Sequence, residues 1–263
     1  MNDSKNIRRI ALPVGLGIIC IVLWEVIVRT FDVSPFIFPG PVKIIEALIR
    51  DWGLLSHALL VTLEITAMAF VCAVVGGGLI AVFFSLSKTI ETTLFPYAVI
   101  MQVTPVVAVA PLLIIWIDNV YLALLACAWL VAFFPVLSNA TVGLNSVDHN
   151  LRDMFRLYGA TQSQTLLSLR IPAAMPYFLT GVRISGGLSL TGAVVAEFVA
   201  GTSGQASGLA YRILEASYQL QTPRMFAALF LISLTGVAIF LVTTYMSHLL
   251  LSRWHESALV REK

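Results

Sequence analysis

Residues 145–176 read NSVDHNLRDMFRLYGATQSQTLLSLRIPAAMP. This stretch contains two short amphipathic helical patterns that are separated at Gly159. Gly159 can adopt a left-handed backbone conformation that ends the first helix, and the Thr161 hydroxyl can accept hydrogen bonds from free amides at the start of the second helix. These features predict a rigid elbow in the loop 145–172, between two strongly apolar segments.

Apolar segments that can cross a membrane lie on both sides of this loop. The chain of 263 residues is 59% hydrophobic and 11% charged, with a mean hydropathy of +0.91, whereas soluble domains have about 25% charged residues. A bilayer core takes roughly 20 helical residues to cross. This composition excludes a water-soluble globule and predicts an all-α polytopic membrane protein with one transmembrane domain over residues 1–263. About six transmembrane helices are expected, at residues 10–28, 57–87, 94–117, 120–144, 173–200 and 225–251.

Lysine and arginine residues fall unequally on the two sides of the predicted membrane. With the N-terminus inside, ten of them lie on the inner side, five lie on the outer side, and Arg183 lies within a span. Short cytoplasmic loops carry the excess of positive charge in membrane proteins. Both termini and the loop 145–172 are therefore expected in the cytoplasm. No small-x-small cleavage site follows the first apolar segment, which is expected to remain as a span.

Two outer connections contain further amphipathic patterns. One begins at Pro41, and the other follows the glycine-rich residues 201–208. We expect a short helix in each, and two interpretations are open. The helices form an outer vestibule, or they only pack at the membrane interface.

Several function classes are excluded by missing patterns. No Gly-Lys dipeptide is present, so the chain has no P-loop and is not its own ATPase. The four histidines lack HExxH spacing, and the three cysteines lack CxxC spacing, so no metal site is expected. The net charge is +2 without a long basic run, which argues against nucleic-acid binding.

One enzyme class has a weak signature. Residues 201–204, GTSG, match the short GxSG string of rhomboid-type intramembrane serine proteases. The catalytic hydroxyl would need a base, and His248 is expected about 36 Å deeper along the last helix. An intramembrane protease therefore remains a distant alternative.

Polar and proline positions inside the predicted spans are candidates for a solute path or gate. Ionisable groups are costly in lipid, and a proline frees a backbone carbonyl that must be surrounded by protein or water. Arg183 could instead snorkel to the interface, and the small residues of the span 173–200 could serve packing or line a pore. The candidates are Glu64, Gln102, Thr104, Pro105, Arg183 and Glu197.

The elbow resembles the "EAA" loop of bacterial ATP-binding-cassette (ABC) importer permeases, EAA-x3-G-x9-I-x-L-P. Residues 153–155 occupy the positions of the EAA triplet and keep only an acidic residue at the first of them. Gly159 and residues 169–172 occupy the later positions of the motif. In that family the loop forms the coupling helix that docks into a cleft on the ATPase subunit. The resemblance assigns this coupling role to Asp153, Met154, Phe155, Gly159, Ala160, Thr161, Leu169, Ile171 and Pro172.

The resemblance extends over nearly the whole chain and favours the nitrate, sulfonate, taurine and bicarbonate importer group. It includes residues 35–48, 103–117 and 179–204. It implies a type I ABC importer permease fold in the bacterial inner membrane. Many relatives carry a basic residue near the position of Glu64, so the identity of their substrate cannot be assigned directly to this chain.

The resemblance also implies partners. They are two ABC ATPase subunits, a second permease copy or paralogue, an extracytoplasmic substrate-binding protein and membrane lipid. ATP and Mg²⁺ would be bound by the ATPase partner, and no cofactor by this chain. The solute would be a small anion such as a sulfonate or nitrate, or a heteroaromatic such as a thiamine-pyrimidine precursor or riboflavin.

An ATP-independent secondary transporter or channel is the alternative of a different class. It would need coupling-ion ligands or an inverted repeat, and the sequence shows neither convincingly.

Overall fold

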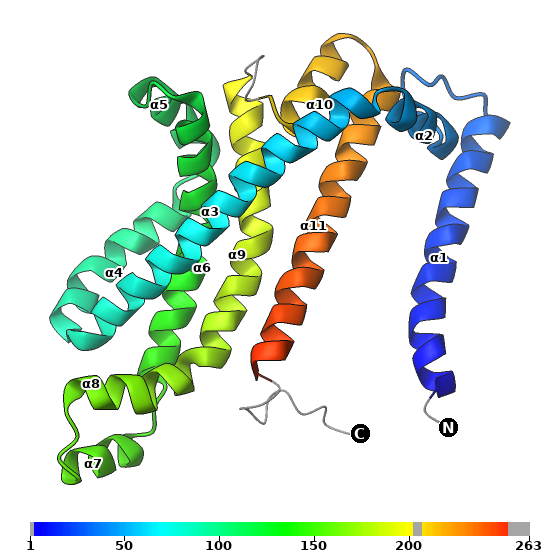
Figure 1. Ribbon diagram of the computed structural model, residues 1–263. Coiled ribbons are helices and arrows are strands. Elements are labelled where there is room, and N and C mark those ends of the chain that lie inside the picture. The colour runs from blue at the N-terminus through cyan, green and yellow to red at the C-terminus, as the bar shows by residue number, and fades with distance from the viewer. Residues whose placement is uncertain (1–2, 202–206, 252–263) are drawn as a thin grey trace.

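The computed structural model describes residues 3–201 and 207–251, and every regular element in these ranges is helical (Figure 1). Five helices are long and apolar enough to cross a membrane, and the bent pair α4 and α5 can make a sixth span. The prediction of an all-α chain with about six spans is confirmed. The helices are α1 (Asp3–Thr30), α2 (Pro41–Arg50), α3 (Trp52–Leu86), α4 (Lys88–Val103), α5 (Val106–Trp116), α6 (Val120–Asn145), α7 (His149–Leu157), α8 (Gln162–Thr165), a π-helical segment (Leu166–Arg170), α9 (Ile171–Ala200), α10 (Leu209–Tyr218) and α11 (Thr222–Leu251).

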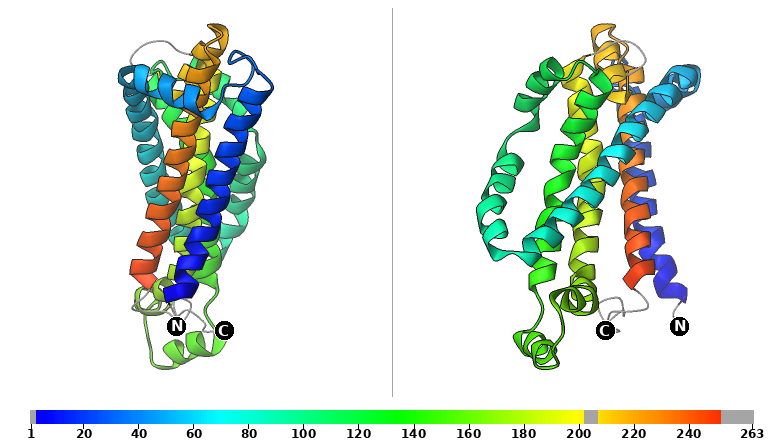
Figure 2. Two further views of the ribbon diagram at one scale, coloured as in Figure 1. Left: turned by 90° about the vertical axis from the view of Figure 1, so that its right-hand side faces the viewer. Right: turned by 60° about the vertical axis from the view of Figure 1, so that its left-hand side comes forward.

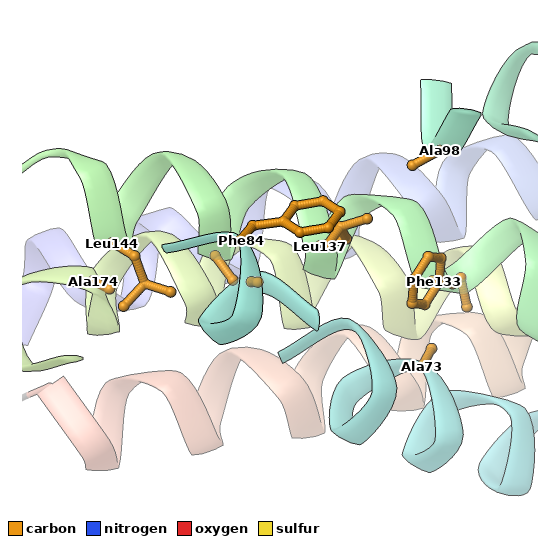
Figure 3. Close-up of a cluster of buried hydrophobic side chains, with 10 residues drawn as sticks. Ala73, Phe84, Ala98, Phe133, Leu137, Leu144 and Ala174 are labelled. Atoms are coloured by element: carbon orange, nitrogen blue, oxygen red, sulfur yellow. The ribbon is translucent and has the colours of Figure 1, made fainter. Parts of the chain in front are cut away.

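The core of the bundle is formed by α3, α6 and α9, with α6 packed against both neighbours. Figure 3 shows one buried cluster, in which Phe84 of α3 lies beside Leu137 of α6, and Ala174 of α9 lies beside Leu144 of α6. All three helices are apolar around most of their circumference, as expected for spans that contact protein on one side and lipid on the other. The predicted spans 57–87, 120–144 and 173–200 correspond to these helices.

Small residues on α9 allow its close approach to α6. A Cβ atom at Gly181 would lie 2.7 Å from the Pro135 carbonyl oxygen, and one at Gly192 would lie 2.8 Å from the Ala128 Cα. Contacts this short exclude any side chain at these positions. The small-residue face of α9 is therefore a packing surface, the first of the two uses that the sequence left open.

The predicted span over residues 94–117 is broken into two helices in the structure. The chain ends α4 at Val103, turns by 99° and continues as α5 from Val106. The right-hand view of Figure 2 shows these two helices as an arm on one side of α6. The break falls at Pro105, which has no N–H and restricts Thr104 before it to an extended conformation, with φ −72° and ψ 121°.

The two predicted amphipathic helices in the outer connections are confirmed as α2 and α10. Both lie at the end of the bundle opposite α7 and α8 (Figure 1). Aromatic contacts join α1 to this end: Trp24 stacks on Phe38 with ring centroids 5.2 Å apart, and Phe38 meets Phe226 of α11 edge to face at 5.8 Å.

An ion pair holds the corner between α2 and α3 to the start of α11. The Arg224 Nε donates to Asp51 Oδ2 at 2.7 Å, and both side chains are largely buried. Burial raises the pKa of Asp51, but its hydrogen bonds from Arg224 and Arg50 outweigh that effect, so its pKa lies below the usual range. The carboxylate is therefore charged at neutral pH and fixes the α2–α3 corner against the start of α11.

Most of the GTSG string considered for a protease, residues 202–204, lies outside the described residues. His248 is in the last turn of α11, and α11 runs from the outer connection to the opposite end of the bundle (Figure 1).

Candidate coupling loop and translocation path

The loop between α6 and α9 projects beyond the ends of the spanning helices (Figure 1). Its first helix, α7, is capped by Asp148, whose carboxylate accepts from Asn150 N at 2.8 Å. No residue of α7 is buried. Leu157 and Tyr158 are 88% and 84% exposed, so the loop presents large apolar side chains outside the membrane region. Such a surface is typical of a docking site for another protein.

The predicted elbow is confirmed. Gly159 has φ +71°, the left-handed conformation that ends α7. Thr161 and Gln164 form a capping box at α8: the Thr161 hydroxyl accepts from Gln164 N at 3.3 Å, and Gln164 Oε1 accepts from Thr161 N at 2.8 Å. Two reciprocal bonds and one glycine therefore set the angle between α7 and α8.

The elbow continues into α9 without a loop. Ile171 N donates to the Leu166 carbonyl, an i−5 bond that defines a π-helical turn. Pro172 follows directly and lacks the N–H that would continue the series of hydrogen bonds. Leu166 and Ile171 also pack on the core cluster of α3 and α6. The elbow, the π-helical segment and α9 therefore form one continuous helical path.

Arg170 is the residue of this loop that the sequence prediction missed. Its Nη1 donates to the Ser85 carbonyl at 2.6 Å and its Nε to the Leu144 carbonyl at 3.0 Å, while Nη2 reaches Asn145 Oδ1 at 2.9 Å. Ser85 and Leu144 lie in the last turns of α3 and α6, where carbonyls have no partner within the helix. One guanidinium group therefore joins the coupling loop to both helix ends. Its position between Leu169 and Ile171 was the available signal, since an arginine between apolar residues needs acceptors.

The other predicted loop residues lie along α7 and the elbow. Asp153 is exposed and 3.8 Å from Arg156, and Met154 is 43% exposed. Phe155 and Ala160 are half-buried. Asp153 and Met154 are thus accessible to a partner, whereas Phe155 and Ala160 belong to the inner side of the loop.

Three of the predicted path residues lie together at the break between α4 and α5. Gln102, Thr104 and Pro105 line a cavity of about 430 Å³, together with Val109 of α5 and Leu188 of α9 among others. The residues lining this cavity carry no ionisable side chain. The cavity is therefore mainly apolar, with an amide, a hydroxyl and freed backbone groups as its polar elements.

Glu64 and Arg183 do not line this cavity. Glu64 is exposed on α3 and accepts a hydrogen bond from the Tyr121 hydroxyl at 3.1 Å. Arg183 is exposed on α9 and makes no ion pair with any described residue. Among the described residues of one copy, Arg183 therefore has no carboxylate partner.

Glu197 has a different environment, because its side chain is only 2% exposed. Oε1 accepts from the Thr62 hydroxyl at 2.8 Å, and Oε2 accepts from Ala210 N at 3.0 Å. Thr62 in turn accepts from Leu209 N at 2.9 Å. Glu197 thus joins α9 to α3 and caps the N-terminus of α10.

Helices long and apolar enough to cross a membrane, an exposed apolar elbow at one end and a cavity at a broken helix are features expected of a membrane permease that works with a separate partner. The chain belongs to the family of binding-protein-dependent transport system inner membrane components, whose model matches residues 73–255. It is the multi-pass inner-membrane permease of an ABC importer for small solutes. The ATPase is a separate subunit in this family, and the permease has no nucleotide-binding site.

Two curated relatives match almost the full chain. The formylaminopyrimidine transport permease protein ThiX of Halalkalibacterium halodurans is 30% identical over 91% of this chain and 94% of its own length. The riboflavin transport system permease protein RibX of Chloroflexus aurantiacus is 32% identical over 94% of this chain and 91% of its own length. A crystal structure of an amino acid ABC transporter has the same fold, with a TM-score of 0.62 at 19% identity, over 78% of this chain and 96% of that one.

The left-handed conformation of Gly159 gives a direct prediction for coupling. A Cβ at this position would meet no atom within 4 Å, so a substitution acts only through the backbone. Valine in the left-handed region costs about 1–2 kcal/mol, whereas asparagine adopts this region readily. We expect Gly159→Val to lower ATP hydrolysis by the complete importer about tenfold, and Gly159→Asn to retain most of it. Equal rates in both variants would show that the elbow angle is not needed.

Proposed function

We propose that this chain forms one half of the solute path of an importer with a second permease copy or paralogue, two ABC ATPase subunits and an extracytoplasmic binding protein. The exposed face of α9 supports the second permease. It carries Thr180, Arg183, Gly187 and Thr191, all exposed in the single chain. Polar groups at membrane depth face protein or water and not lipid. A second copy across a two-fold axis would give this face such an environment.

In this proposal both termini are cytoplasmic. The start of α1, the end of α11 and the elbow all lie at one end of the bundle (Figure 1). The elbow is the ATPase-docking surface in the proposal, and ATP is available in the cytoplasm. The excess of lysine and arginine on this side supports the same orientation.

The proposed solute is a small heteroaromatic compound and not an inorganic or sulfonate anion. The cavity at the α4–α5 break, which is the observation that carries this proposal, lies within the range of ligand-binding sites, about 300–1,000 Å³. A path for nitrate or a sulfonate would call for a cationic group to replace water around the anion. Gln102 and Thr104 offer neutral donors and acceptors instead, which suit a pyrimidine or a related ring.

Two relatives, at 30% and 32% identity, support this choice. They are named as permeases for formylaminopyrimidine and for riboflavin, both heteroaromatic. Relatives named for aliphatic sulfonates, taurine and nitrate are also similar, so the two solute classes must be compared directly.

The test is uptake into proteoliposomes that contain the permease, its ATPase and its binding protein. The probes are formylaminopyrimidine, riboflavin, taurine, ethanesulfonate and nitrate, each with and without internal ATP. We expect ATP-dependent uptake of a heteroaromatic probe, and a reduction of about tenfold in Gln102→Leu through loss of a polar contact with the solute. Val103→Leu, beside it on the same cavity, is the matched control.

Uptake of only the anions would overturn the proposed solute class. Uptake that proceeds without the ATPase would instead favour the secondary transporter. Isolation of the chain from native membranes without an ATPase, in several mild detergents, would argue for the same alternative.

A further inference from the structure

A second cavity, of about 460 Å³, lies between the elbow and the ends of the spanning helices. It is lined by the corner between α3 and α4, the end of α6, and residues of α7, α8 and the π-helical segment. Four cationic side chains and one carboxylate line it: Lys88, Arg152, Arg156, Arg170 and Glu91. The charged side chains of this lining therefore sum to +3.

The single carboxylate of the lining is already paired. Lys88 Nζ lies 2.9 Å from Glu91 Oε1, and Asn145 Nδ2 donates to the same oxygen at 3.4 Å. Three guanidinium groups remain. Arg170 donates to neutral oxygens, so its hydrogen bonds leave its charge uncompensated.

The other two arginines are also left without a strong partner. Arg156 is 3.8 Å from Asp153, and both side chains are more than half exposed, so this pair contributes little. Arg152 makes no ion pair with a described residue, and its Nε is buried without a hydrogen-bond partner. A buried donor without an acceptor is costly, which points to a bound group that supplies one.

One donor group of this cavity, the Arg170 guanidinium, is held in a fixed position. Arg170 uses three of its five N–H groups on the helix ends, and the other two stay available on a fixed guanidinium plane. Two N–H groups of one arginine guanidinium can donate in parallel to two oxygens of a phosphate. Phe84 and Leu86 add apolar surface beside these donors. The combination of a basic and an apolar lining fits a phosphate that is attached to an apolar chain.

The height of the cavity along the bundle points to the same ligand. Ser87 and Asn145 mark the ends of α3 and α6, where the spanning segments leave the membrane, and the α3–α4 corner lies beside α8 (Figures 1 and 2). In the orientation of the proposed function, on which this step rests, this is the headgroup level of the cytoplasmic leaflet. Anionic lipids collect in such basic pockets between transmembrane helices.

We propose that this cavity binds a phosphate group, supplied by an anionic phospholipid of the cytoplasmic leaflet. The bound phosphate accepts from Arg152 Nε and from the free N–H groups of Arg170. It links the α3–α4 corner to the elbow, so lipid composition sets how firmly the elbow is held.

The test is thermal unfolding of the purified full-length permease in detergent with added probes. The probes are phosphatidylglycerol, phosphatidylcholine and inorganic phosphate at equal concentrations. We expect phosphatidylglycerol to raise the midpoint of unfolding and phosphatidylcholine to leave it unchanged. Arg152→Gln should weaken the apparent affinity for phosphatidylglycerol about tenfold, while Lys43→Gln, a surface change on α2 at the opposite end, should retain it.

The other outcomes each decide one point. A shift produced by inorganic phosphate alone supports the phosphate site but overturns the lipid as its source. An equal response of Arg152→Gln and the unchanged chain overturns the site. Loss of the lipid response when the ATPase subunit is added would assign these arginines to an acidic surface of that subunit and overturn the lipid proposal. Because the readout needs neither ATP nor a solute, the result is separate from the test of the transport function.

Discussion

Replacing Arg170 by methionine is expected to separate the coupling loop from the helix bundle and to reduce ATP-driven uptake at least tenfold. The side chain makes three hydrogen bonds, to Ser85 O, Leu144 O and Asn145 Oδ1. They hold the start of α9 to the ends of α3 and α6. Methionine is unbranched and reaches about as far as the arginine Nε, and it removes all of these donors.

The size of the effect follows from the type of bond that is lost. Hydrogen bonds to a charged group contribute about 1.5–3 kcal/mol each, and the partial exposure of this site lowers that figure. A total loss of about 3 kcal/mol shifts the equilibrium between an anchored and a released elbow by roughly 100-fold. The carbonyls of Ser85 and Leu144 would also lose the donor that satisfies them at two helix ends.

Arg170→Lys is the matched variant, because it keeps the charge and loses the fork. A lysine ammonium reaches fewer of the three acceptors at once, so we expect an intermediate rate. The measurement is ATP hydrolysis by the reconstituted importer, with thermal unfolding of the permease to monitor folding. If Arg170→Met folds normally and hydrolyses ATP with full coupling to uptake, the hydrogen bonds of Arg170 to the ends of α3 and α6 have no role in coupling ATP hydrolysis to transport.

The coupling loop could be predicted in detail because its structure is local. Gly159 and Thr161 act on amides and carbonyls within a few residues, and the sequence shows these pairs directly. The amphipathic patterns of α2 and α10 are local in the same way. Spans longer than about 20 residues are also recognised from composition alone.

The features that the sequence did not show depend on residues far apart in the chain. Arg170 contacts Ser85, which lies 85 positions earlier, and Glu197 accepts from Thr62 across 135 positions. The periodic pattern of apolar residues in a sequence does not show which distant residues contact each other. The break at Pro105 has a different cause: the proline was visible, but whether a helix kinks or breaks depends on what packs around it.

Replacing Glu197 by leucine is expected to release α10 from the end of the bundle opposite the elbow. The carboxylate is the acceptor for the Thr62 hydroxyl and for Ala210 N, and the side chain is almost fully buried. Leucine leaves both donors without a partner, and each buried unsatisfied group costs about 1–3 kcal/mol. We expect a lower midpoint of unfolding and loss of the hydrogen-exchange protection of the Ala210 amide by about 100-fold. Glu197→Gln should give a midpoint of unfolding and an Ala210 protection between those of the unchanged chain and those of Glu197→Leu. An amide offers one acceptor oxygen where the carboxylate offers two.

Gly208→Ala tests the same contact from the other side. A Cβ at Gly208 would overlap the carboxyl group of Glu197, so alanine should displace it and lower the protection of Ala210 in the same way. Gly53→Ala is the matched control, because a Cβ there meets no atom within 4 Å. Glu64→Leu removes another carboxylate from a spanning helix, but an exposed one with a single partner, Tyr121, and should leave Ala210 protected. Unchanged exchange at Ala210 in both Glu197→Leu and Gly208→Ala would show that α10 is held by its apolar contacts with α11 and not by this carboxylate.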